Sequence, residues 1–304
     1  MQTEFNSLIQ LVTAIPDEAA AIAYFTAIRW KDGVFCPYCG SVKVYHFSDK
    51  RTHKCGDCRQ RFSIKVGTIF EGTKLPLRKW LMAVWLITSH KKGIASTQLA
   101  KDLGITQKSA WFVMHRLRAA ATTKSFNAPL KGFVEADETY IGGKETNKKL
   151  SKRTPKQHGG KGKAMVVGMV ERGGDLRAFH VGSDRTHGAI RKLVTQNVAE
   201  GSNLITDEHA AYRHLTGFHH YSVNHSKKEY VRDEFIHTNT LEGAWSLLKR
   251  QIYGIHHWVS PKHLDRYVSE MTWRYNRREM EEGNRVNALI AGSDGRLTYK
   301  ALIA

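Results

Sequence analysis

The chain has 304 residues, which at roughly 100 to 200 residues per domain predicts two or three domains. Hydrophobic residues make up 41% of it and charged residues 25%, so the composition excludes global disorder. Lys and Arg exceed Asp and Glu by 19, and this surplus predicts a polyanionic partner, first of all nucleic acid. No run of about 18 apolar residues occurs, which argues against a membrane partner.

Residues 1–30 are expected to form an N-terminal helical segment. Their first residues carry acids and lack the basic region and small-residue cleavage site of a signal peptide. Together with the basic surplus, this predicts a cytoplasmic, nucleoid-associated protein.

All the cysteines lie in one C-x2-C-x15-C-x2-C pattern, formed by Cys36, Cys39, Cys55 and Cys58. This spacing is typical of zinc sites, because each C-x-x-C aims two thiolates at one point and four thiolates close a tetrahedral shell. The predicted ion is therefore structural Zn2+. Two disulfides are the alternative, which a reducing cytosol disfavours, and a redox C-x-x-C would need no second copy.

The residues around these cysteines alternate polar with apolar or aromatic side chains, as short strands do. We therefore predict a zinc ribbon over residues 31–74. Its lysines and arginines either contact DNA phosphates or only keep a small module soluble.

Residues 75–122 have apolar positions at helical spacing and predict three helices. The last two are separated by Gly104, and Thr106 is a plausible N-cap, as in a helix-turn-helix. The second of these helices would read DNA bases at its start and contact phosphates further on. The predicted DNA-contacting residues are Gln107, Lys108, Ser109, His115, Arg116 and Arg118. A plain helical hairpin between two domains is the alternative.

Beyond a linker, residues 131–280 alternate strand and helix patterns in the order strand, hairpin, helix, strand, which predicts a mixed α/β sheet. The first strand runs toward Asp137, and a later buried strand ends at Asp207. Both aspartates are expected at the carboxyl ends of neighbouring strands, where open α/β sheets usually place their chemistry.

A helix is predicted over residues 237–250, with Asn239, Glu242 and Lys249 on one face. Carboxylates that converge from two strands and a helix bind hard cations, so Mg2+ or Mn2+ is expected. Two such ions suit displacement at a phosphodiester. Lys249, with Arg250 beside it, would contact the DNA. The alternative is that the aspartates cap helices or turns and that the helix face is simply solvated.

Residues 142–163 hold seven Lys and one Arg against one acid. We expect this segment to clamp DNA beside the acidic site, through residues such as Lys144, Lys148 and Lys149. A solvated loop is the alternative, although a long loop inside a compact domain is uncommon unless it is functional.

The sequence resembles bacterial insertion-sequence DDE transposases with a zinc-ribbon N-terminus. The resemblance rests on VEADETYIGGK around Asp137, ITDEHAAY around Asp207 and HTNTLEGAWSLLKR around Glu242, and it extends from Cys36 to about Arg278. It implies an RNase H-like catalytic domain that uses two Mg2+ or Mn2+ ions. It further implies cleavage at the terminal inverted repeats of an element, strand transfer into double-stranded target DNA, and a homodimer or larger assembly on DNA.

The third metal ligand is the uncertain part of this resemblance, because members often have Asn where others have Glu. Our prediction is Glu242, since a carboxylate binds Mg2+ more strongly than an amide, with Asn239 as an auxiliary ligand. Glu138 is excluded, because its side chain should point to the opposite side of the strand from Asp137. Residues 281–304 are expected to be a tail without chemistry. A non-enzymatic zinc-ribbon and helix-turn-helix regulator with a degenerate C-terminal domain is the alternative function.

Overall fold

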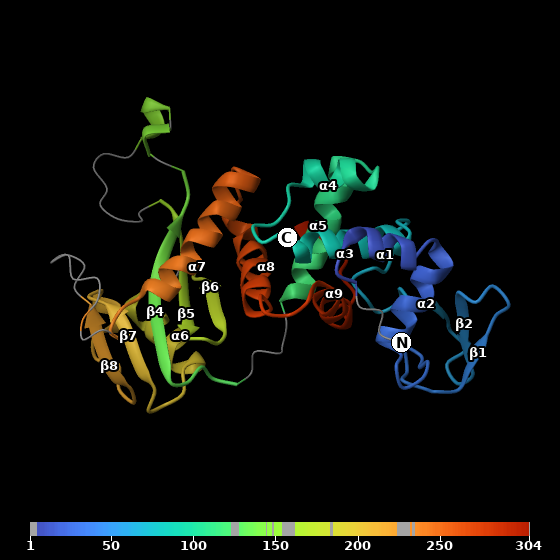
Figure 1. The fold of residues 1–304 in the computed structure, drawn as a ribbon, viewed down its shortest axis with the longest axis horizontal. Coiled ribbons are helices and arrows are strands. Elements are labelled where there is room, and N and C mark those ends of the chain that lie inside the picture. Colours follow the sequence, from blue (N-terminus) through green and yellow to red (C-terminus); the bar gives the residue numbers. More distant parts are fainter. Residues whose placement is uncertain are drawn as a thin grey trace. The chain divides into compact units, whose positions relative to one another are not determined.

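The computed structural model describes residues 5–122, 128–143, 145–147, 149–153, 162–182, 185–223, 232 and 235–303. The chain divides into two compact units (Figure 1). Unit 1 contains residues 1–123 together with 279–304, and unit 2 contains residues 124–278. Each unit is described separately.

Unit 1 begins with two helices and a small sheet. Helices α1 (Leu8–Ala14) and α2 (Glu18–Arg29) precede strands β1 (Val44–His46), β2 (Thr52–Cys55) and β3 (Arg61–Ser63). The strands form an antiparallel sheet in the order β1-β2-β3. The predicted ribbon is thus a three-stranded sheet of short strands.

A helical group forms the rest of unit 1. It consists of α3 (Leu77–Ser89), α4 (Ser96–Leu103), α5 (Gln107–Ala121), α9 (Glu282–Ala291) and α10 (Tyr299–Ile303). Helix α3 follows Pro76 and has no cap from its own segment, but the Glu18 carboxylate accepts hydrogen bonds from the backbone N–H groups of Leu77 and Arg78. A carboxylate at a helix N-terminus satisfies orphan donors and complements the helix dipole. This contact joins α2 to α3.

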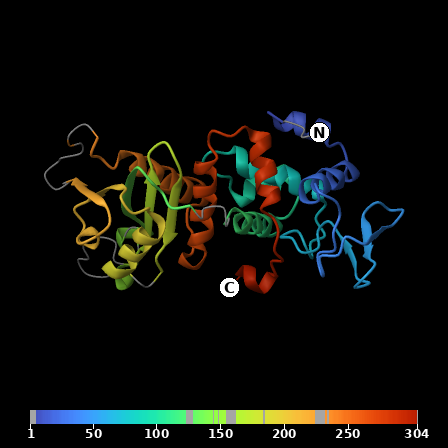
Figure 2. The ribbon, with the colours of Figure 1, turned by 90° about the horizontal axis from the view of Figure 1, so that it is seen from below.

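The C-terminal residues differ from the expected tail. Helix α9 packs against α3, and the dark red C-terminal helices lie among the blue to green N-terminal segments (Figure 2). The backbone of Ser293 accepts from Ile69 N–H, and Gly295 N–H donates to Gly67. Residues 279–304 are therefore an integral part of unit 1, because apolar side chains such as Val286 and Leu289 are buried there.

The expected helix-turn-helix pattern is present in α4 and α5. Gly104 ends α4 in the left-handed conformation, with φ +58°, which suits glycine because it has no Cβ. The Thr106 side chain accepts from Ser109 N–H and so caps α5, as the sequence predicts.

Unit 2 contains a five-stranded mixed sheet. The strands are β4 (Phe133–Ile141), β5 (Ala164–Glu171), β6 (Leu176–His180), β7 (Asn203–Asp207) and β8 (His219–Val223), in the order β6-β5-β4-β7-β8. Strands β4, β7 and β8 are parallel to one another, and the pairings β4 with β5 and β5 with β6 are antiparallel. The mixed α/β class is confirmed.

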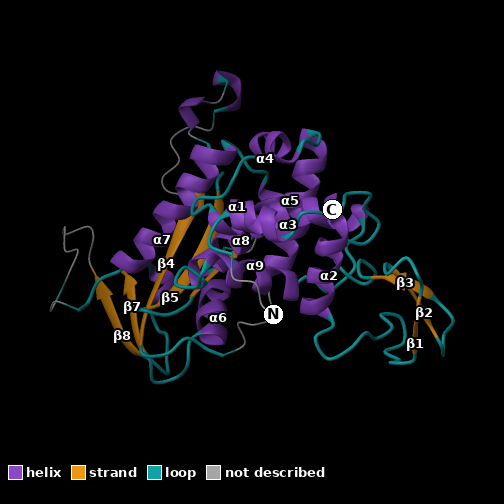
Figure 3. Ribbon diagram, turned by 45° about the vertical axis from the view of Figure 1, so that its right-hand side comes forward, coloured by secondary structure: helices purple, strands orange, loops and turns teal. Residues whose placement is uncertain are grey.

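Helices cover both faces of this sheet (Figure 3). Helices α7 (Asn239–Lys249) and α8 (Leu264–Asn276) pack on one face, and α6 (His187–Asn197) packs on the other. A π-helical segment, η5 (Arg250–His256), continues α7, and 3-10 turns occur at η1 (Glu145–Asn147), η2 (Leu150–Lys152), η3 (Ala210–Tyr212) and η6 (Pro261–His263). Within the described residues, no single helix is long and apolar enough to cross a membrane; α1 and α2 pass that test only as a pair bent by 101°.

Candidate active site

Three carboxylates converge in unit 2. One oxygen each of Asp137, Glu138 and Asp207 lie within 4.8 Å of one another, and all three side chains are half-buried. Asp137 and Glu138 belong to β4 and Asp207 ends β7. The two predicted aspartates are therefore brought together, with a third carboxylate beside them.

The register of the sheet produces this convergence. Strands β4 and β7 pair in parallel up to Ala136 and Thr206, so the next residues, Asp137 and Asp207, meet where the pairing stops. Asp137 is not at the end of its strand as expected, because β4 continues to Ile141 through its pairing with β5 on the other side. The site thus lies at a step in the sheet, where one strand ends and its neighbour continues.

Each of the three carboxylates has one oxygen held by a protein donor. The Trp245 indole N–H donates to Oδ2 of Asp137 at 2.9 Å, and the backbone N–H of His209 donates to Oδ1 of Asp207 at 2.9 Å. The Tyr212 hydroxyl donates to Oε2 of Glu138 at 3.0 Å. Such contacts orient carboxylates and leave the second oxygen of each for another partner.

His209 adds a further polar contact to Glu138. Ala211 N–H donates to its Nδ1 at 3.3 Å, so Nδ1 is the acceptor and the ring proton belongs on Nε2. Nε2 lies 3.5 Å from Oε1 of Glu138. The imidazole therefore turns its N–H toward the carboxylates.

The protonation of the cluster is shifted by burial and by mutual repulsion. Burial, then the charges of Glu138 and Asp207, raise the pKa of Asp137 to about 7. Burial and the charge of Asp207 raise the pKa of Glu138 as well. Two unit charges at this separation repel by on the order of 3 kcal/mol at an effective dielectric constant near 20. A cation at the site relieves this repulsion, and oxygen ligands of this kind suit Mg2+ or Mn2+.

The exclusion of Glu138 was wrong. Its backbone position does alternate with that of Asp137, since Trp245 of α7 contacts Asp137 and Tyr212, beyond the opposite face, contacts Glu138. At the step in the sheet, however, the longer Glu138 side chain reaches the same point as the shorter aspartates. Strand alternation alone does not show this, because it gives the direction of a side chain and not where its end lies.

The residues predicted on α7 lie outside this cluster. Among the described residues, Glu242 is not part of any group of three or more potential metal ligands drawn from His, Cys, Asp and Glu. Its carboxylate is exposed, with Oε1 3.4 Å from the Thr238 hydroxyl. Asn239 is the first residue of α7 and Lys249 its last; both are exposed, as is Arg250. Whether Asn239 or Glu242 reaches a bound metal stays a prediction.

A buried carboxylate that sequence reasoning missed fastens α7 to β4. Glu135 has no solvent exposure; it accepts from Leu241 N–H at 2.9 Å and from Arg172 Nε at 2.7 Å. Arg172 also donates to the backbone carbonyls of Phe235 and His237. A buried charge needs such partners, so Glu135 and Arg172 hold the start of α7 against the strand that carries Asp137.

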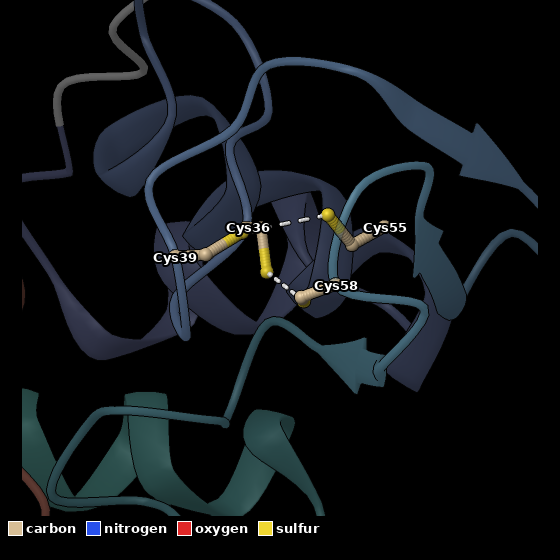
Figure 4. A group of neighbouring side chains, drawn as sticks. All are labelled: Cys36, Cys39, Cys55 and Cys58. Atoms are coloured by element: carbon tan, nitrogen blue, oxygen red, sulfur yellow. Dashed lines mark hydrogen bonds between the residues drawn. The ribbon is translucent and has the colours of Figure 1, made fainter.

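The four cysteines of unit 1 form a second group of possible ligands (Figure 4). Sγ of Cys36 lies 3.6 Å from Sγ of Cys58, and Sγ of Cys39 lies 3.6 Å from Sγ of Cys55. All four are free thiols, which leaves the disulfide alternative without support. A tetrahedron of sulfurs about 2.3 Å from a zinc ion has edges of about 3.8 Å, so the arrangement fits Zn2+.

The start of α5 is accessible to a partner. Gln107, Lys108 and Ser109 are exposed, and Gln107 Nε2 donates to the Ser96 hydroxyl at the start of α4. These three positions therefore remain candidates for DNA contact.

The predicted phosphate contacts of Arg116, and of His115 and Arg118 near it, were wrong. All three side chains are buried. The Arg116 guanidinium donates to the backbone carbonyls of Ile69, Glu71 and Leu297. Because these carbonyls come from the post-ribbon loop and the C-terminal segment, Arg116 joins parts of unit 1 and cannot reach a phosphate.

The basic segment 142–163 is described in part. Lys149 is exposed and precedes η2. Lys144 and Lys148 lie outside the described residues. The Tyr253 hydroxyl contacts both the backbone N–H and the carbonyl of Gly142, at 3.1 Å each, and this places the beginning of the segment beside η5.

Two protein families match the chain. Residues 129–276 match the ISXO2-like transposase domain, and residues 16–61 match the transposase zinc-ribbon domain. The chain combines these two transposase domains. The predicted family is thereby confirmed, and the DDE domain implies an RNase H-like fold, with which the mixed sheet agrees.

One curated relative of this transposase-domain chain is described as an uncharacterized protein in transposable element ISH50 of Halobacterium salinarum. It is 29% identical over 261 residues, which cover 80% of this chain and 84% of the relative. No solved structure matches the chain significantly.

Proposed function

We propose that this protein is a transposase that cuts DNA at the ends of an insertion sequence and joins the freed 3′ hydroxyl to target DNA. The observation that carries the proposal is the convergence of Asp137, Glu138 and Asp207 at a step in the sheet, inside the segment that matches a transposase domain. A regulator that only binds DNA has no need of three carboxylates held at one point.

In this proposal Asp137, Glu138 and Asp207 hold divalent cations, and Asn239 or Glu242 supplies a further ligand from α7. Two Mg2+ or Mn2+ ions activate the attacking oxygen and stabilise the leaving oxygen of a phosphodiester. The protein's own contribution is positioning: Trp245, Tyr212 and the His209 backbone each fix one carboxylate oxygen. Preorganised groups of this kind stabilise charge without rearranging during the reaction.

The remaining parts of the chain would bind double-stranded DNA. The start of α5, with Gln107, Lys108 and Ser109, would read the terminal inverted repeats, and the ribbon holding Zn2+ would support it. Lys249, Arg250 and the basic segment around Lys149 would contact phosphates near the acidic cluster. Cutting two ends in one complex requires a homodimer or a larger assembly on DNA.

Cleavage and strand transfer on labelled linear DNA that carries the ends of the element test the proposal. The wild type should form metal-dependent joined products in Mg2+ or Mn2+. The variant Asp207→Asn should lose both cleavage and joining while it still binds the ends. Glu200→Gln, an exposed acid in the same unit, should behave as the wild type.

Two results would contradict the proposal. Equal cleavage by Asp207→Asn would place the chemistry elsewhere. Specific end binding by the wild type with no cleavage in either metal would favour the DNA-binding regulator instead.

A further inference from the structure

Trp258 is unusual among the seven tryptophans of the chain, all of which the structure describes. Its relative exposure is 70%, whereas the other six are buried or half-buried. Tyr253, five residues earlier, is 43% exposed. Large aromatic rings seldom remain in water at this level unless they meet a partner.

The backbone before Trp258 is strained. Segment η5 is π-helical, and His257 follows it with φ +60° and ψ −43°. A non-glycine residue with positive φ is uncommon, and both features occur preferentially at functional sites. The chain thus adopts an unfavourable conformation at the point where it leaves the helix and presents the indole to solvent.

The surroundings of Trp258 in the sequence are basic. No acid occurs between Glu242 and Asp265, whereas Lys249, Arg250 and Lys262 do, together with three histidines. All three cations are exposed, although Lys262 has a contact within the protein. An exposed aromatic ring among cations and without acids suits nucleic acid, where the ring stacks on a base and the cations meet phosphates.

This surface continues from the acidic cluster along α7. Three contacts connect β4 with α7 and η5 in the same order along both elements: Glu135 with Leu241, Asp137 with Trp245, and Gly142 with Tyr253. The helix therefore runs alongside the strand in the same direction (Figure 1). Along this direction, Lys249, Arg250 and Tyr253 follow the carboxylate site, and Trp258 lies just beyond the turn.

We propose that Trp258 stacks on an unpaired base of the DNA strand bound at the acidic cluster, with Tyr253 and Arg250 beside it. A base inside a duplex has both faces covered by its neighbours, so an exposed indole can stack only on a base that is unpaired or at a strand end. Cleavage and joining at an element end create such bases. The inference rests on the proposed function, of which it specifies the substrate.

Binding without added Mg2+ or Mn2+ tests the platform independently of activity. The probes are a duplex with a short single-stranded thymidine extension and the same duplex with blunt ends, both followed by fluorescence anisotropy. The wild type should prefer the extended probe. Trp258→Leu should lose that preference by about tenfold or more, as expected for the removal of one stacking aromatic, and Trp258→Phe should keep most of it.

A 2-aminopurine in place of the first unpaired base provides a direct signal of stacking. Its fluorescence should fall on binding to the wild type and to Trp258→Phe, and stay high with Trp258→Leu. Because the side chain is exposed, all three proteins should have the same zinc content and melting temperature. Equal preference and equal quenching in the wild type and Trp258→Leu would overturn the inference.

Two further results separate this inference from others. If Trp258→Leu loses self-association in sedimentation without any change in DNA binding, the surface contacts another protein copy and the platform is wrong. If no variant cuts DNA but the extended probe still depends on Trp258, the platform stands and the proposed function fails. If Asp207→Asn abolishes cleavage while Trp258→Leu binds and stacks like the wild type, the function stands and the platform fails.

Discussion

The indole N–H of Trp245 donates to the Asp137 carboxylate at 2.9 Å, although 108 positions separate the two residues. The ring reaches Asp137 by crossing Gly168, the β5 residue paired with Asp137. A Cβ added at Gly168 would lie 2.4 Å from the Trp245 ring. Glycine at this position is therefore a condition for the hydrogen bond.

Gly168→Ala should push the indole away and destabilise unit 2 by about 1–3 kcal/mol, the usual effect of overpacking a core. Denaturant unfolding measures this change. Gly243→Ala, at a helical position with open space around it, should not destabilise the protein. Unchanged stability of Gly168→Ala would mean that the Trp245 ring can move aside without loss.

Trp245→Phe should keep most of the packing but remove the donor to Asp137. We expect weaker Mn2+ binding, by several-fold, because an oriented carboxylate is a better ligand than a free one. Titration with Mn2+ followed by electron paramagnetic resonance measures the affinity. Trp273→Phe, which changes a buried indole of the same unit, is the matched control and should bind Mn2+ as the wild type does.

Stability without metal should decrease as the pH rises. The pKa of Asp137 is about 7 in the folded protein and 3.8 is its ordinary value, so folding favours the protonated acid. The contribution is fully present below pH 4 and is lost as the pH rises through about 7. Urea midpoints across this range should fall in the wild type and fall less in Asp137→Asn. Mn2+ binding should strengthen over the same range, because the proton must leave first.

Glu138→Gln should weaken Mn2+ binding more than Glu242→Gln does. The first carboxylate lies in the cluster with Asp137 and Asp207, whereas the second is exposed on α7. A loss of about tenfold or more is expected for Glu138→Gln, measured by calorimetric titration. The opposite ranking would show that α7 supplies the third ligand, in agreement with the sequence-based prediction.

Arg116→Ala and Lys108→Ala should have opposite effects. Removing Arg116 leaves three backbone carbonyls without their donor and should destabilise unit 1 by about 1–3 kcal/mol. Lys108 is exposed at the start of α5, so Lys108→Ala should keep the melting temperature and weaken binding to element ends. Normal stability of Arg116→Ala together with weaker DNA binding would restore its predicted phosphate contact.

One Zn2+ per chain is expected from the four free thiols. Cys36→Ser should bind less zinc and lose the order of the ribbon, because a small sheet of short strands has little core of its own. Metal analysis and proteolysis of residues 31–74 measure both effects. Full zinc content in Cys36→Ser would contradict a four-thiolate site.

The sequence by itself determined the features that depend on a few neighbouring residues. The cysteine spacing specified the thiol cluster, Gly104 and Thr106 specified the turn between two helices, and the strand patterns led to Asp137 and Asp207. Local chemistry of this kind is readable because spacing, left-handed glycine and capping act over a few positions.

The tertiary structure decided where long side chains end and what covers them. It brought Glu138 to the aspartates at a step in the sheet, and it buried Arg116 against the C-terminal segment. It also paired Glu135 with Arg172 and placed Trp245 across Gly168. Each of these contacts joins residues on different elements, and residue type and spacing do not specify such contacts, because burial and reach depend on how whole elements pack.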